Sequence, residues 1–167
     1  MSISLFNLGL SFAAALALHE AGHFLAARVC RVPVSGAGFG WGPKVFSFRS
    51  KEVDYQFRAL PIGAFIKMDM SALQQRPLLQ QLFVLLAGVV VNFALSAMAW
   101  GTFFGTLNLI LAVVNLFPLY QQDGWKTLMV ISRRVFQRPS PIVEWTFTIS
   151  AVVIGLILVS RALFLST

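Results

Sequence analysis

Charged side chains are scarce in this chain of 167 residues. Asp, Glu, Lys and Arg together make up 11% of it, whereas hydrophobic residues make up 57%. Soluble domains carry about 25% charged residues, so this composition excludes an ordinary soluble protein and favours a membrane protein. The length suits a single domain over residues 1–167. The single cysteine, Cys30, excludes an intramolecular disulfide and indicates either inert packing or a thiolate ligand.

Acidic residues are rarer than basic residues. The chain has six Asp and Glu against 13 Lys and Arg, which gives a net charge of +7. Twelve of the 13 basic residues lie in two blocks, 28–76 and 126–138, between long apolar stretches. Basic loops on one side of several apolar spans follow the positive-inside pattern, which places these blocks in the cytoplasm and both termini outside. We therefore expect a lipid bilayer as partner and no nucleic acid.

Four apolar stretches are long enough to form membrane helices, since about 20 residues cross a bilayer. We expect helices at about 4–28, 78–101, 105–136 and 142–165. The third is expected to be broken near Pro118, because a proline removes one backbone hydrogen bond from a helix. The predicted fold class is an α-helical polytopic membrane protein with about four transmembrane helices.

The segment 33–68, between the first two of these stretches, has a different pattern. Residues 44–49 and 53–58 each alternate between apolar and polar, around a short polar turn, and 64–68 form a third extended run. This pattern predicts a small membrane-associated β-hairpin or sheet. The sheet either shields the segment from lipid or offers an exposed edge to an extended peptide by strand addition.

The chain has only two histidines, His19 and His23, and both lie in the first apolar stretch. Residues four apart share one face of a helix, so both imidazoles can reach one cation. Glu20 lies beside them, where it can reach a metal-bound water. This is the His-Glu-x-x-His pattern of zinc hydrolases, in which Glu is the general base. The alternative is a pair of structural histidines that satisfy their own hydrogen bonds.

Catalytic zinc takes three protein ligands and leaves a fourth position for water. Asp123, which follows the break near Pro118, is the candidate for the third ligand. Alone, it could equally be a turn or helix-capping aspartate before Gly124. A zinc site at His19 and His23 needs a third protein ligand, and this favours Asp123 as a metal ligand. We expect one Zn²⁺ per chain. Asn92 lies in the second apolar stretch. We expect its side chain either to form a hydrogen bond between helices or to contact the substrate.

These motifs together resemble those of the site-2 protease family of intramembrane zinc metalloproteases. The first metal motif of the family is similar to His19, Glu20 and His23. The second is similar to Asn115, Pro118, Asp123 and Gly124. Residues 60–68 and the glycines near Gly38 and Gly40 resemble the hairpin region of bacterial members that cleave anti-sigma factors.

The resemblance implies hydrolysis of peptide bonds in single-span membrane proteins or their remnant peptides, with Glu20 as the catalytic residue. It also implies a bacterial inner-membrane location, with the active site toward the cytoplasm. The residues that we expect to bind substrate are Asn115, Pro118, Gly38, Gly40, Gly63, Phe65 and Asn92.

The chain departs from the family pattern in two ways. The bacterial relatives carry PDZ domains between the second and third helices, and the connection 101–105 leaves no room for one. Tyr120 and Trp125 stand where the family often has proline and glycine. We therefore expect a transmembrane substrate that arrives already trimmed or is delivered by a partner. The alternatives are a catalytically inactive scaffold and a zinc-binding membrane protein such as a carrier, although a carrier is expected to show repeated halves.

Overall fold

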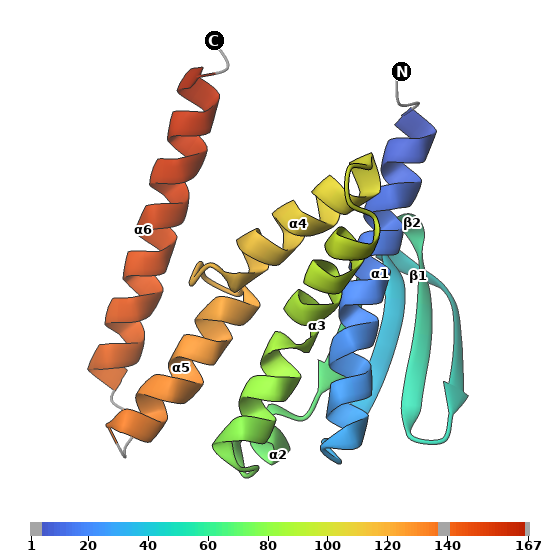
Figure 1. Ribbon diagram of the computed structural model, residues 1–167. Coiled ribbons are helices and arrows are strands. Elements are labelled where there is room, and N and C mark those ends of the chain that lie inside the picture. Colours follow the sequence, from blue (N-terminus) through green and yellow to red (C-terminus); the bar gives the residue numbers. More distant parts are fainter. Residues whose placement is uncertain (1–4, 137–140, 166–167) are drawn as a thin grey trace.

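The computed structural model describes residues 5–136 and 141–165 of the chain (Figure 1). Two of its helices, α1 (Leu5–Val29) and α3 (Leu78–Met98), are long and apolar enough to cross a membrane. They pack against each other, and Figure 1 shows the strands along one side of α1 with α3 on the other. The short helix α2 (Met70–Gln74) connects the strands to α3.

The helix expected over 105–136 is two helices, α4 (Phe103–Leu116) and α5 (Asp123–Val135). Phe117 ends α4 with φ −65° and ψ 141°. This extended conformation follows from Pro118, because a proline ring disfavours helical backbone at the preceding residue. The last helix, α6 (Pro141–Leu165), contains a shorter apolar segment, Glu144–Leu156. Two of the four expected membrane helices therefore have the required length and apolarity within the described residues.

Two long antiparallel strands, β1 (Val34–Ser50) and β2 (Val53–Met68), confirm the expected β structure between the first two membrane-length helices. Ser50 pairs with Val53 across a tight turn. The first part of β1 is paired on both sides, since Gly38 lies opposite both Phe65 and Gln56. The third extended run, 64–68, is the end of β2, so it forms an edge of the sheet.

The core lies where the end of α1 meets the start of α3. Ala26, Ala27, Val84 and Leu85 are buried there, and Leu73 of α2 is fully covered. Small residues let two apolar helices approach closely, which is how helices associate in a membrane. This packing fixes the face of α1 that carries the histidines against α3.

Candidate metal centre

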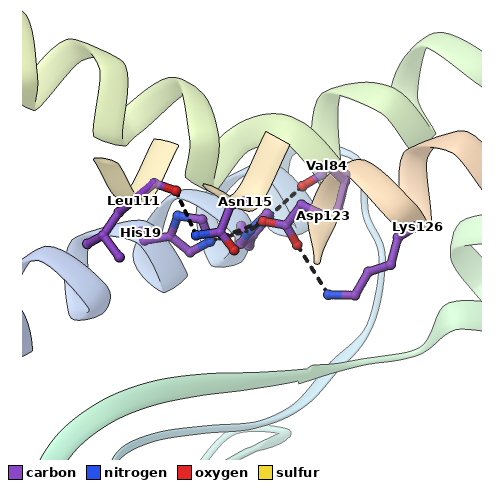
Figure 2. A network of polar contacts seen from close by, with 7 residues as sticks. His19, Val84, Leu111, Asn115, Asp123 and Lys126 are labelled. Carbon is purple, nitrogen blue, oxygen red and sulfur yellow. Dashed lines mark hydrogen bonds and ion pairs between the residues drawn. The ribbon is translucent and has the colours of Figure 1, made fainter. Parts of the chain in front are cut away.

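Three side chains that the sequence predicts as ligands meet inside the protein (Figure 2). His19 Nε2 and His23 Nε2 lie 3.1 Å and 3.0 Å from Asp123 Oδ2, and the two nitrogens are 3.2 Å apart. All three side chains are buried. The two histidines come from α1 and the aspartate from the first residue of α5, so the fold joins segments about a hundred residues apart.

This group has the composition and spacing of a zinc site. Two imidazole nitrogens and one carboxylate oxygen are a ligand set that Zn²⁺ takes in hydrolases. Ligand atoms bound tetrahedrally at about 2.0–2.1 Å from zinc are roughly 3.3 Å from one another. The separations of 3.0–3.2 Å are close to that value, so the residues fit the ion with little movement.

The backbone of α3 orients one of the histidines. His23 Nδ1 lies 2.8 Å from the carbonyl oxygen of Val84, to which it donates a hydrogen bond. A proton on Nδ1 leaves the lone pair of Nε2 free for a metal, because the hydrogen bond that one ring nitrogen donates decides which tautomer the histidine adopts. His23 is therefore held in the form that binds zinc.

Asp123 is held from its other side by Lys126. The Lys126 ammonium lies 3.1 Å from Oδ1, whereas Oδ2 faces the two histidines (Figure 2). Each oxygen of the carboxylate thus has its own partner, which fixes the direction of Oδ2. Lys126 was not among the predicted site residues. The signal for it is its position one turn after Asp123, because residues three apart on a helix face each other.

Gly88 of α3 lies against both imidazoles and was also not among the predicted site residues. A Cβ atom at Gly88 would lie 2.5 Å from His23 Nε2 and 2.7 Å from His19 Nε2. Any side chain there would occupy the place of the two imidazoles. A glycine in an apolar span is visible in the sequence, but the residues that it faces depend on how α1 and α3 pack.

Glu20 lies at the boundary between the metal centre and the sheet. It lines a cavity of about 350 Å³ together with His23, Asp123 and Lys126, and residues 65–68 of β2 line the same cavity. It also lines a neighbouring cavity of about 200 Å³. The Glu20 carboxylate therefore borders space that is open to a bound molecule, as a general base requires.

The structure brings some of the predicted substrate residues to this space and leaves others away from it. Phe65 lines both cavities beside Glu20, and Gly38 lines the smaller one. Gly40 and Gly63, with φ of 95° and 91°, line neither cavity and serve as bends in β1 and β2. Glycine is favoured at these two positions because the backbone there has a positive φ, which is strained for other residues.

Asn115, Pro118 and Asn92 occupy three different environments. Asn115 Nδ2 donates to Leu111 O at 2.9 Å, as Figure 2 shows. Pro118 lies exposed between α4 and α5. Asn92 is fully buried, and neither of its amide atoms has a hydrogen-bond partner among the described residues. Asn92 thus lies within the helix packing rather than on the walls of the cavities at Glu20.

The fold and the site together define a membrane protein with a metal centre of the zinc hydrolase type. The sequence model that describes Peptidase family M50, the family of the site-2 proteases, matches residues 8–104 of this chain. The chain belongs to this family, so the resemblance seen in the sequence is confirmed.

Curated relatives agree with this assignment. A candidate zinc metalloprotease of Fusobacterium nucleatum is 38% identical over 87 residues, which are 47% of this chain and 26% of that protein. A membrane metalloprotease of Arabidopsis thaliana chloroplasts is 32% identical over 132 residues, which are 71% of this chain and 29% of that protein. The chain thus spans between a quarter and a third of the length of these relatives. Zn²⁺ is the cofactor, and His19, His23 and Asp123 form the group that could hold it.

Replacing Gly88 by alanine tests the packing of the centre. We expect zinc affinity to fall at least tenfold in Gly88→Ala, because the added methyl group would displace the imidazoles and misplaced ligands bind metal weakly. Zinc is measured per folded chain by atomic absorption during titration with a chelator. Gly9→Ala in α1 is the control, since a Cβ there meets nothing within 4 Å. Equal zinc affinity in both variants would contradict this role of Gly88.

Proposed function

We propose that this chain is a membrane-embedded zinc endopeptidase that cleaves single-span membrane proteins or their remnant peptides. The observation that carries the proposal is the convergence of His19, His23 and Asp123 beside the Glu20 carboxylate, at a cavity bounded by the edge of a sheet. The family and the names of its relatives support peptide-bond hydrolysis as the reaction.

Glu20 performs the proton transfers in this proposal. Bound zinc supplies a Lewis acid that lowers the pKa of its water to about 7 and polarises a carbonyl group. The Glu20 carboxylate takes the proton of the attacking water and then delivers it to the leaving amine. Its place between the ligands and the open cavity suits both transfers. Lys126, on the same cavity, keeps the Asp123 carboxylate directed at the histidines.

The edge of β2 holds the substrate in an extended form. A helical segment presents no free carbonyl to the site, since its backbone groups are bonded internally. Residues 65–68 line the cavity and lie at an edge of the sheet, which supports pairing with a peptide strand. Phe65 and Gly38 contribute to the neighbouring cavity, where a substrate side chain can be placed.

The chain is arranged as four membrane helices with both termini outside and the site toward the cytoplasm, in a bacterial inner membrane. The helical segments of α4 with α5 and of α6 are the third and fourth spans in this proposal. Arg28 and Arg31 lie at the end of α1, and Arg133 and Arg134 lie in the last turn of α5. These arginines lie at the same end of the molecule, which supports the positive-inside orientation.

The substrate arrives trimmed or is delivered by a partner. Only residues 99–102 connect α3 to α4, so this connection holds no domain that could select substrates. The fit of an unwound segment to the sheet edge contributes to selection in this proposal, together with any partner that brings the substrate.

Replacing Glu20 by glutamine separates chemistry from metal binding. We expect Glu20→Gln to keep one zinc and to lose at least 100-fold in cleavage rate, because general acid–base catalysis contributes about 10²–10⁴-fold. The probe is a synthetic single-span peptide with a fluorophore and a quencher on either side of a helix-weakening Gly-Ser pair. Glu52→Gln, at the exposed turn of the sheet, is the control and should keep the wild-type rate.

Two results would contradict this proposal. Full cleavage by Glu20→Gln would remove Glu20 from the mechanism. A zinc-loaded wild type that cleaves no single-span peptide would favour the alternatives, an inactive scaffold or a zinc-binding membrane protein.

Asn115 acts in this proposal by accepting a hydrogen bond from the substrate backbone, while Pro118 keeps the chain beside it unwound. Its Nδ2 already donates to Leu111, which leaves Oδ1 as the acceptor. We expect Asn115→Ala to cleave the fluorogenic peptide more slowly with zinc still bound. Asn108→Ala is the matched control, since Asn108 lies about two turns earlier on α4, makes the same type of bond to Phe104 O, and is fully buried. Equal slowing in both variants, or loss of zinc in Asn115→Ala, would contradict this role.

A further inference from the structure

A separate cleft, of about 830 Å³, lies between α2, the start of α3, the end of α5 and the start of α6. It shares no lining residue with the two cavities at Glu20. Polar side chains that donate hydrogen bonds dominate its wall: Arg76, Arg133, Arg134, Gln74, Gln75 and Gln81. We call it the arginine cleft.

The cleft carries excess positive charge. Arg133 Nε is 2.7 Å from Glu144 Oε1, so this pair is neutral. Arg76 and Arg134 have no carboxylate partner among the described residues. The two guanidinium groups therefore remain uncompensated at a concave surface, which is the arrangement that recognises phosphate groups.

One of these guanidinium groups is held in place. Arg76 donates from Nη2 to the carbonyl oxygen of Arg31 at 2.7 Å, which ties it to the end of α1 and leaves its other N–H groups for a ligand. The helix α3 begins beside it, and no side chain caps its first turn. The positive end of the α3 dipole adds to the attraction for an anion at this point.

The floor of the cleft is apolar. Val130 belongs to the buried core cluster, and Leu78 packs against that cluster. Pro77 adds further apolar surface. A guanidinium wall over an apolar floor suits an amphiphile, with its phosphate at the arginines and its hydrocarbon along Leu78 and Val130.

The cleft lies at the membrane surface if α1 and α3 cross the bilayer. Figure 1 shows the end of α1, the start of α3, the end of α5 and the start of α6 at one end of the molecule. The cluster Arg28, Arg31, Arg76, Arg133 and Arg134 gathers there. Basic pockets between membrane helices on the cytoplasmic side are typical binding places of anionic lipid headgroups.

We propose that the arginine cleft is a binding site for a phosphate group, supplied either by an anionic phospholipid of the cytoplasmic leaflet or by a free phosphate compound. The bound phosphate bridges Arg76 and Arg134, and thereby links the start of α3 to the end of α5. The same two helices carry Gly88 and Asp123, so occupancy of the cleft clamps the helices that build the metal centre. The proposal of this site does not rest on the proposed proteolytic activity.

The test compares binding of lipid and of free phosphate by the full chain. The chain is reconstituted in phosphatidylcholine nanodiscs with trace spin-labelled phosphatidylglycerol or spin-labelled phosphatidylcholine, and the immobilised fraction is measured by electron spin resonance. Inorganic phosphate is titrated calorimetrically into chain in an uncharged detergent. The variant is Arg76→Gln with Arg134→Gln. The control is Arg28→Gln with Arg49→Gln, which removes the same charge outside the cleft.

We expect the wild type and the control to immobilise phosphatidylglycerol about fivefold or more over phosphatidylcholine, because the two uncompensated guanidinium groups of the cleft favour an anionic headgroup over a zwitterionic one. The cleft variant should lose this preference. Saturable phosphate binding without a lipid preference, lost in the cleft variant alone, identifies a free phosphate compound as the ligand. Binding of neither ligand by the wild type, or equal losses in the variant and the control, overturns the proposal.

Zinc content shows whether the cleft variant is folded. If the double variant loses zinc, Arg134→Gln alone replaces it, because the exposed Arg134 side chain makes no ion pair with a described residue. A folded single variant that keeps the full lipid preference and the full phosphate binding also overturns the proposal.

Discussion

The structure depends on the burial of two imidazoles and a carboxylate against one another in an apolar helix pair. Polar groups placed in a membrane interior are costly unless they are paired or bind a metal. His19, His23 and Asp123 meet that demand with three ligand atoms within hydrogen-bond distance of one another. When bound, zinc would be held by these three ligand atoms and would replace their mutual contacts with stronger ones. Gly88 makes the arrangement possible, because only a residue without a side chain leaves room for both rings.

The break between α4 and α5 is the second requirement. The break ends α4 at Leu116 and lets a new helix begin at Asp123, whose carboxylate contacts both histidines. Phe117 leaves the helical conformation because a proline follows it, and α5 then begins at Asp123. The carboxylate thus sits in the first turn of a helix, where the positive end of the dipole and Lys126 both stabilise its charge.

The sequence alone predicted those features of the fold and the site that depend on local periodicity. The spacing of His19 and His23 placed both on one helix face, and alternation in 33–68 predicted the strands. Asp123 followed from the three-ligand requirement of zinc. The sequence could not show that Gly88 and Lys126 border the centre, or that Asn92 is fully buried. Which residues a helix face contacts depends on the elements that pack against it. The double pairing of Gly38 likewise depends on how the strands fold back.

The most direct test of the account is the zinc content of the purified chain and of its ligand variants. We predict about one zinc per chain in the wild type and marked loss in His23→Ala and in Asp123→Asn. Asp54→Asn, on the exposed sheet, should keep the metal. A folded wild type without zinc, or ligand variants that bind it as tightly as the wild type, would contradict the assignment of the centre.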